Sequence, residues 1–265
     1  MADNRIDGQT DDWRNIPDLF RRANGCLPTP WEERFGPLRR GRVDELVVVA
    51  QMGQSIDGRI ATETGHSKYI NGDAGLDHLH RLRALMDAVV VGVSTAIADD
   101  PQLTVRRVAG PSPVRVVIDP RGRLPDCSRL LAADGVRRIV VTGNETRRTF
   151  PAGVEVVRVG VENGGAAPAE ILQALRERGL RRVLIEGGAQ TVSKFLTAGC
   201  LDRLHIVTAP MLLGAGQPSI ALPPVARADE ALRPPVCTHL LADEVLFDVD
   251  LSAQRVLVGN AKTSV

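Results

Sequence analysis

The sequence predicts an α/β fold, in which a mostly parallel central sheet carries helices on both faces. From residue 46 onward, short continuous apolar runs alternate with segments of helical periodicity. Such runs are typical of parallel strands buried on both faces, and the alternation is typical of β-α-β units. The chain has 265 residues, of which 43% are hydrophobic, enough for one large domain or two small ones. Because only 3% are aromatic, an aliphatic core is expected.

The expected elements follow the hydrophobic pattern along the chain. Strands are expected at the apolar runs 46–50, 88–93, 114–118, 138–142, 154–159, 183–185, 204–209, 244–250 and 255–258. Helices are expected at the periodic segments 74–86, 169–178 and 190–198. In the first helix, Leu76, Leu79, Leu82 and Leu85 form one apolar face. The last two strands, joined tightly around Ser252, predict an antiparallel hairpin at one edge of the sheet.

Residues 1–40 differ from the rest of the chain. They contain Trp13, Trp31, several prolines and mixed charges, with little periodicity. We expect an N-terminal extension that packs on a main domain of residues 41–265, and disorder is the alternative.

The composition excludes several classes of protein. The chain carries 33 Lys and Arg against 32 Asp and Glu, a formal net charge of +1, which gives no bulk attraction for nucleic acid. No apolar stretch approaches the roughly 18 residues that a membrane span needs, and no signal-like segment opens the chain. The four cysteines form no C-x-x-C pair and the histidine spacing fits no metal pattern. We therefore expect a cytoplasmic protein without a metal site.

The segment Glu186-Gly187-Gly188 is the most informative part of the chain. It stands between the apolar run 183–185 and a helical stretch. Glycine has no Cβ, so an anionic ligand can approach the backbone closely, and the start of a helix attracts negative charge. The motif predicts a site for phosphate or pyrophosphate, and a simple strand-to-helix turn is the alternative.

Two loops after the first strand offer hydrogen-bonding groups. Asp57 precedes a glycine, which is a turn signal. This loop is either a hairpin tip or a loop folded over a ligand, with Ser55 and Asp57 as its hydrogen-bonding groups. Further on, Ser67 and Lys68 would hold an anion or a sugar hydroxyl.

The region after the second strand offers a second candidate phosphate cradle. Gly92 and Thr95 lie where a short helix opens. Asp99 and Asp100 are adjacent carboxylates that need different partners, because repulsion would otherwise raise a pKa. Arg106 would bind a substrate phosphate through two hydrogen bonds.

The turn Asp119-Pro120-Arg121 follows the end of the third strand. In dinucleotide-binding folds this place suits contacts to the adenosine ribose or its 2′-phosphate. Arg121 or Arg123 would then favour the phosphorylated cofactor, and an exposed basic turn is the alternative.

Taken in order, these segments resemble the reductase domain of the bifunctional riboflavin-biosynthesis deaminase/reductase, a dihydrofolate-reductase-like family. The likeness covers about 43–265 and rests on SIDGR (55–59), GHSKYI (65–70), DDPQLTVR (99–106), VIDPR (117–121), IEGG (185–188) and APMLLG (209–214). The resemblance implies a dihydrofolate-reductase-like fold and a homodimer. It also implies reduction of 5-amino-6-(5-phosphoribosylamino)uracil, whose ribose opens to a ribityl chain with hydride from NADPH.

The resemblance also assigns roles by position. The catalytic residues would be Glu186, Asp57 and Gln51. The residues that bind NADPH would be Gly187, Gly188, Thr95, Asp99, Asp119, Arg121 and Gly92. The residues that bind the phosphorylated substrate would be Ser67, Lys68, Asp100, Leu103, Arg106 and Ser55.

Two departures from the family pattern bear on the activity. The deaminase zinc signature, H-x-E followed by P-C-x-x-C, is absent, so the chain would supply only the reductase activity. Many family members carry lysine where Gln51 stands, and an amide cannot act as a cationic acid. The substrate therefore stays open between the riboflavin precursor and another ring, such as dihydrofolate or a secondary-metabolite pyrimidine. A non-catalytic nucleotide-binding relative is a third interpretation.

Overall fold

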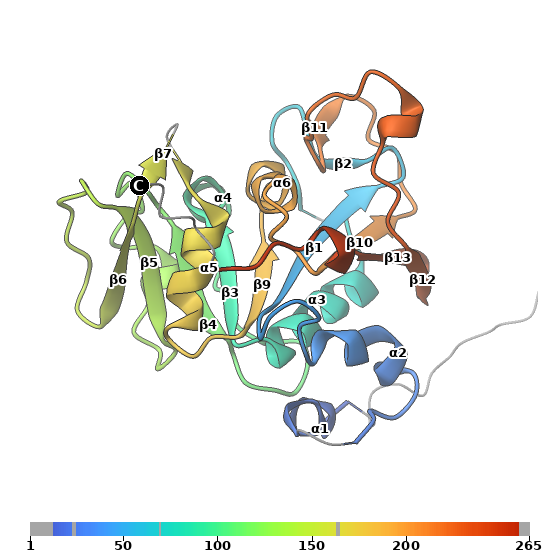
Figure 1. Cartoon of the computed structure of the whole chain (residues 1–265), viewed down its shortest axis with the longest axis horizontal. Coiled ribbons are helices and arrows are strands. Elements are labelled where there is room, and N and C mark those ends of the chain that lie inside the picture. Colours follow the sequence, from blue (N-terminus) through green and yellow to red (C-terminus); the bar gives the residue numbers. More distant parts are fainter. Residues whose placement is uncertain (1–12, 23–24, 69, 163–164, 260–265) are drawn as a thin grey trace, which may run out of the picture.

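The computed structural model describes residues 13–22, 25–68, 70–162 and 165–259. These residues form a nine-stranded sheet (Figure 1). From edge to edge its strands are β12 (Val236–Leu241), β13 (Glu244–Asp250), β10 (Arg203–Ala209), β1 (Val47–Ser55), β9 (Arg182–Glu186), β3 (Ala88–Gly92), β4 (Val114–Ile118), β5 (Arg138–Gly143) and β6 (Val154–Val159). Strand β13 runs antiparallel to both of its neighbours, and all other neighbours are parallel. The predicted mostly parallel sheet is confirmed.

Helices and small strand pairs surround this sheet. The α-helices are α1 (Ile16–Arg21), α2 (Trp31–Phe35), α3 (Asp73–Leu85), α4 (Val93–Asp99), α5 (Pro168–Arg176) and α6 (Ala189–Thr197). Short 3-10 turns occupy Gly36–Leu38, Arg129–Leu131, Ala228–Glu230 and Ser252–Gln254. Two small antiparallel pairs join β2 (Arg59–Thr62) to β11 (Gly216–Pro218) and β7 (Val161–Glu162) to β8 (Gly165–Ala166). Within the described ranges no helix is long and apolar enough to cross a membrane.

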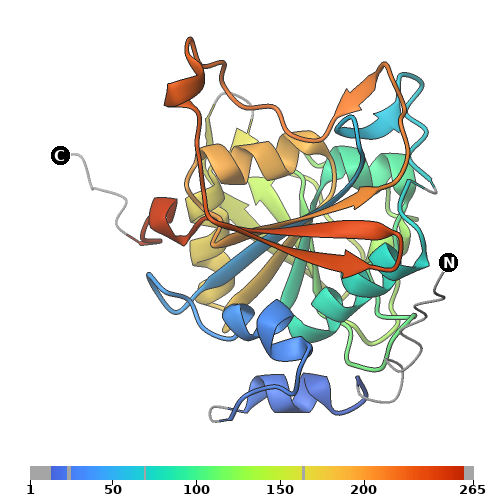
Figure 2. The same cartoon turned by 90° about the vertical axis from the view of Figure 1, so that its right-hand side faces the viewer.

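The sheet has a separate apolar core on each face, as the predicted burial on both sides requires. Helices α5 and α6 pack on one face, where Leu172 and Phe195 join strand residues such as Val48 in one cluster. On the other face, Leu82 of α3 and Trp31 of α2 join a second cluster. Figure 2 shows α6 and the two N-terminal helices on opposite sides of the sheet.

The described residues before residue 46, here called the arm, pack against α3. Trp13, Trp31 and Phe35 form an aromatic cluster with ring centroids 5.1 to 5.9 Å apart. The Trp13 Nε1 donates a hydrogen bond to the Ala109 carbonyl at 2.7 Å. Trp31 and Phe35 are fully buried. The first twelve residues of the predicted extension lie outside the described residues.

Helix α3 is anchored by charged groups from distant strands. Glu244 of β13 accepts hydrogen bonds from the Gly72 and Gly75 N–H groups at 3.0 and 2.7 Å. A carboxylate at this end satisfies free N–H groups and complements the helix dipole. The predicted leucine face is only partly correct, because Leu76 is 38% exposed. The polar side chain of His78 is fully buried on this helix, where it contacts His205 of β10.

An antiparallel hairpin lies at the sheet edge as predicted, and its strand 244–250 is confirmed as β13, but its other strand was predicted wrongly. The partner of β13 is β12, which precedes it, and the chain turns at Ala242 rather than at Ser252. Residues 255–258 form no strand. Arg255 is buried there and pairs with Asp202 at 3.3 Å, which fixes this segment against the body of the protein.

Candidate functional site

A cavity of about 1160 Å³ opens at the carboxyl ends of β1, β9, β3 and β4. Ligands of parallel α/β sheets bind at this edge. The volume is slightly above the range of roughly 300 to 1,000 Å³ that is usual for a ligand site. There is therefore room for a dinucleotide beside a second small molecule.

Glu186 ends β9 in the wall of this cavity and is 6% exposed. Arg83 of α3 holds its carboxylate with two hydrogen bonds, from Nε to Oε1 at 2.7 Å and from NH2 to Oε2 at 2.6 Å. Burial alone would lower the pKa of Arg83, but Glu186 raises it above its usual value. The two charged groups therefore stabilise each other and fix the carboxylate in one orientation.

Gln51 is the neighbour of Glu186 across the parallel pair of β1 and β9. Its side chain lines the cavity and is 8% exposed. The Gln51 amide makes no hydrogen bond to a described residue. Both its donor and its acceptor are therefore available to a ligand.

Gly187 and Gly188 lead into α6 and face Thr95 of α4. The Gly188 N–H donates to Thr95 Oγ1 at 3.0 Å. A Cβ would lie 3.3 Å from this oxygen at Gly187 and 3.2 Å at Gly188, and at Gly92 it would lie 2.5 Å from Thr191 Oγ1. Gly187 also has a φ of 124°, which favours glycine. The close packing and the open backbone at a helix start fit the phosphate groups of a dinucleotide.

Other predicted residues line the same cavity from several elements. Ser67 and Lys68 follow β2, Asp99 ends α4, Leu103 follows it, and Arg121 follows β4. Burial raises the pKa of Asp99, and the nearby Lys68 cation opposes this shift. Lys68 thus places positive charge at the opening of the cavity where a phosphate is expected.

Ser55 and Asp57 do not line the cavity. The Ser55 hydroxyl donates to Asp57 Oδ1 at 2.5 Å, and the Leu213 and Gly214 N–H groups donate to the same carboxylate at 3.1 and 2.7 Å. These hydrogen bonds, led by that from Ser55, lower the pKa of Asp57 to about 2. The carboxylate fastens two loops together, so the geometry favours the hairpin-tip alternative and gives no support to a catalytic Asp57.

Asp100, Arg106 and Asp119 also lie outside the lining of the cavity. Asp100 Oδ1 accepts hydrogen bonds from Ser128 Oγ at 3.1 Å and from the Arg129 N–H at 2.8 Å. Asp119 is fully buried and accepts the Leu124 N–H at 2.8 Å. Among the described residues, the Arg106 guanidinium donates a hydrogen bond only to the Thr104 hydroxyl, at 3.0 Å. Their roles in ligand binding stay predictions, since this structure gives the two carboxylates structural partners.

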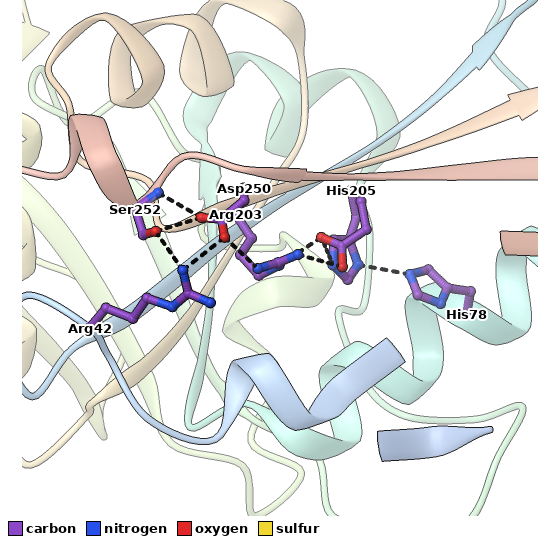
Figure 3. A network of polar contacts seen from close by, with 7 residues as sticks. Arg42, His78, Arg203, His205, Asp250 and Ser252 are labelled. Atoms are coloured by element: carbon purple, nitrogen blue, oxygen red, sulfur yellow. Dashed lines mark hydrogen bonds and ion pairs between the residues drawn. The ribbon is translucent and has the colours of Figure 1, made fainter. Parts of the chain in front are cut away.

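A second polar chain runs beneath α3, away from the cavity (Figure 3). His78 Nε2 of α3 lies 3.0 Å from His205 Nδ1 of β10, and both rings are fully buried. His205 Nε2 lies 3.2 Å from Asp248, which Arg203 holds through two hydrogen bonds of 2.7 and 2.8 Å. Burial lowers the pKa of His78 well below its usual value, so its ring is neutral. This chain joins α3 to β10 and β13.

The sequence analysis missed Arg83 as a residue of the site. Arg83 follows Leu82 in the predicted helix 74–86, and the leucine repeat predicted a buried face that does not include it. The only signal was an arginine at a helix position that its neighbours mark as half-buried. A buried arginine needs an anionic partner, and that expectation would have pointed towards Glu186.

Comparisons with known proteins agree with this geometry. The family model described as the RibD C-terminal domain matches residues 46–234. The riboflavin biosynthesis protein RibD of Aquifex aeolicus (strain VF5) is 35% identical over 170 residues, which cover 64% of this chain and 48% of that protein. The 2,5-diamino-6-ribosylamino-4(3H)-pyrimidinone 5′-phosphate reductase of Methanothermobacter thermautotrophicus is 36% identical over 173 residues, covering 63% of this chain and 79% of that protein.

Solved structures give the same result. The diaminohydroxyphosphoribosylaminopyrimidine deaminase/5-amino-6-(5-phosphoribosylamino)uracil reductase of Thermotoga maritima matches with a TM-score of 0.67 at 28% identity, covering 77% of this chain and 56% of that chain. The chain spans about half the length of the RibD proteins it matches. The expected dihydrofolate-reductase-like fold is confirmed, and the arm lies before the matched residues. The chain belongs to the RibD C-terminal domain family.

Proposed function

We propose that this chain is an NADPH-dependent reductase of 5-amino-6-(5-phosphoribosylamino)uracil in riboflavin biosynthesis. The observation that carries the proposal is one cavity with two kinds of lining. The backbone of Gly187 and Gly188 borders it at the start of a helix, and the polar side chains of Glu186, Gln51 and Lys68 line it as well. The names of the relatives support the same reaction for this chain.

The dinucleotide occupies the glycine end of the cavity. Gly187 and Gly188 let its phosphate groups approach the backbone at the start of α6, and Thr95, whose Oγ1 accepts the Gly188 N–H, donates its hydroxyl to them. Arg121 and Arg123 line the same end, and neither makes an ion pair with a described residue. They favour a cofactor with a 2′-phosphate, because each guanidinium binds such a group through two hydrogen bonds. When bound, NADPH supplies a hydride.

The substrate occupies the end at Glu186. Lys68 and Ser67 bind the sugar phosphate, and the Gln51 amide hydrogen-bonds the open-chain sugar. Arg83 holds the Glu186 carboxylate in one orientation, so Glu186 accepts a hydrogen bond from a sugar hydroxyl. An amide cannot give up a proton, so water supplies the proton that reduction requires. Catalysis rests on positioning and on the chemistry of the cofactor.

Steady-state oxidation of NADPH tests this proposal. We expect turnover with 5-amino-6-(5-phosphoribosylamino)uracil, and the 2,5-diamino-pyrimidinone form, which still carries the exocyclic amine, is assayed beside it. Dihydrofolate serves as the control substrate. No oxidation with either pyrimidine, or oxidation with dihydrofolate alone, would overturn the assignment. The homodimer that the family resemblance implies stays a prediction, for light scattering to test.

A further inference from the structure

Five buried nitrogen atoms without a hydrogen-bond partner gather where α2, α3 and β12 meet. They are Trp31 Nε1, Arg34 Nε, His78 Nδ1, Arg81 Nε and His239 Nε2. Folded proteins pair nearly all buried polar atoms, so such a concentration calls for a missing partner. The junction lies outside the cavity and involves the arm, which precedes the residues matched by the family model.

These atoms belong to neighbouring side chains. The Arg34 and Arg81 guanidinium carbons lie 5.8 and 5.0 Å from the centre of the Trp31 ring. His78 stacks on Phe35 at 5.6 Å between ring centres, and Phe35 stacks on Trp31 at 5.9 Å. Three elements therefore contribute to one cluster of nitrogen atoms.

Among the described residues, no carboxylate pairs with the positive charge of this cluster. Arg34 is 6% exposed, and burial followed by the charge of Arg81 lowers its pKa to about 10. Neither guanidinium donates a hydrogen bond to a described residue. The carboxylates of Glu33 and Asp77 do little to neutralise the two guanidinium charges, because Glu33 is exposed and Asp77 already pairs with Arg107 at 2.5 Å. Two unpaired cations in a half-buried place are unfavourable unless an anion joins them.

The missing partner must accept hydrogen bonds from several directions. Trp31 and the two arginines carry N–H groups in every protonation state. His78 already uses its Nε2 towards His205, as Figure 3 shows, and its Nδ1 is left over. Water would satisfy one or two of these donors without neutralising the charge. A carboxylate presents two oxygens in one plane, whereas a tetrahedral oxyanion presents four that diverge.

We propose that this junction binds a small tetrahedral oxyanion of the phosphate class. The fully buried Trp31 and the nearly buried Arg34 form its inner side, and the half-buried Arg81 and His239 leave a route to solvent. The ion connects the arm to α3 and to the β12–β13 hairpin. Its binding therefore stabilises the folded chain by mass action.

Thermal unfolding of the full chain in phosphate, against chloride at equal ionic strength, tests the site. At ten times the dissociation constant the unfolding temperature should rise by about 3 °C. Arg34→Met should abolish the rise and unfold at an equal or higher temperature in chloride, because it removes an unpaired buried charge. Arg42→Met is the matched control, since Arg42 also lies in the arm but its side chain is 67% exposed. It should keep the full response.

Cationic side chains such as Lys68 also line the cavity. A third variant therefore distinguishes phosphate binding at the junction from phosphate binding in the cavity. Lys68→Met should keep the response if the junction binds the ion, and a response lost there but kept in Arg34→Met would overturn the proposal. Ribose 5-phosphate distinguishes the source of the oxyanion. A response to inorganic phosphate alone assigns a free ion, and an equal Arg34-dependent response to ribose 5-phosphate assigns a phosphate monoester.

A crystal soaked in selenate gives a measurement that does not depend on stability. We expect an anomalous peak within hydrogen-bond distance of Trp31 Nε1 and the Arg34 guanidinium. Anomalous peaks in the cavity alone, or none at all, would refute the site, as would water at the junction.

Discussion

Arg83 and Arg34 are buried to the same extent, and each is 6% exposed, yet their surroundings are opposite. Arg83 holds Glu186 through two hydrogen bonds, and this partner raises the pKa of Arg83. Arg34 has no anionic partner among the described residues, and burial lowers its pKa to about 10. The comparison shows that equal burial shifts the pKa of an arginine in opposite directions, according to whether a carboxylate is paired with it.

The two regions use charge for different purposes. At the cavity the charge of Arg83 is neutralised by Glu186, so the pair acts as a rigid unit that fixes the carboxylate in the cavity wall. At the junction of α2, α3 and β12 the charges of Arg34 and Arg81 have no anionic partner among the described residues. They are therefore available to bind an anion from solution. Both regions act on α3, which carries Arg83 towards one end and Arg81 and His78 nearer its middle.

The largest expected effect comes from breaking the paired region. Arg83→Met leaves Glu186 buried without its partner and should lower the free energy of unfolding by about 3–5 kcal/mol. Urea unfolding measures the loss, with an unchanged m value to show that the folded state is intact. Adding Glu186→Gln should recover most of this loss, because neither charge then remains buried. A double variant as unstable as Arg83→Met would show that packing, not the ion pair, holds α3 here.

The sequence could predict the strands around the cavity because their apolar runs are local. It could also predict the glycine cradle, since Gly187 and Gly188 are adjacent in the chain. The Arg83–Glu186 pair was beyond reach, because the two residues are 103 positions apart. The same limit applies to Glu244, which caps α3 from 169 positions away. Strand β12 was missed for another reason: its apolar residues Val236, Leu240 and Leu241 neither alternate with polar residues nor form one continuous run.

An intermediate effect is expected from pH, because each arginine lies near a buried histidine. Burial first, then Arg83, lowers the pKa of His80 to about 3, and burial first, then His205 and Arg34, lowers that of His78. Both rings are neutral in the fold, whereas the unfolded chain takes up protons below its usual pKa of 6.5. Stability should therefore fall as the pH drops through this value, by roughly 1 kcal/mol per pH unit for each histidine.

Unfolding in urea between pH 7.5 and 5 measures this slope. His78→Phe should reduce it, because one of the histidines whose pKa is lowered in the fold no longer contributes. The exposed His66 gives the control variant His66→Phe, which removes a histidine without disturbing the buried rings. An equal slope in His78→Phe and the unmodified chain would mean that His78 is not held neutral.

The smallest effect on stability is expected at Arg121, which is exposed and lines the cavity where we propose that the dinucleotide binds. Solvent already neutralises an exposed cation, so Arg121→Met should leave the free energy of unfolding nearly unchanged. Its effect should appear only when a 2′-phosphate is present. We expect the KM for NADPH to rise about tenfold while that for NADH stays constant, since one phosphate contact contributes roughly 1–2 kcal/mol. Equal changes for both cofactors would mean that Arg121 contacts a part common to them, and the unpaired cations at this end would then have no role in selecting the phosphorylated form.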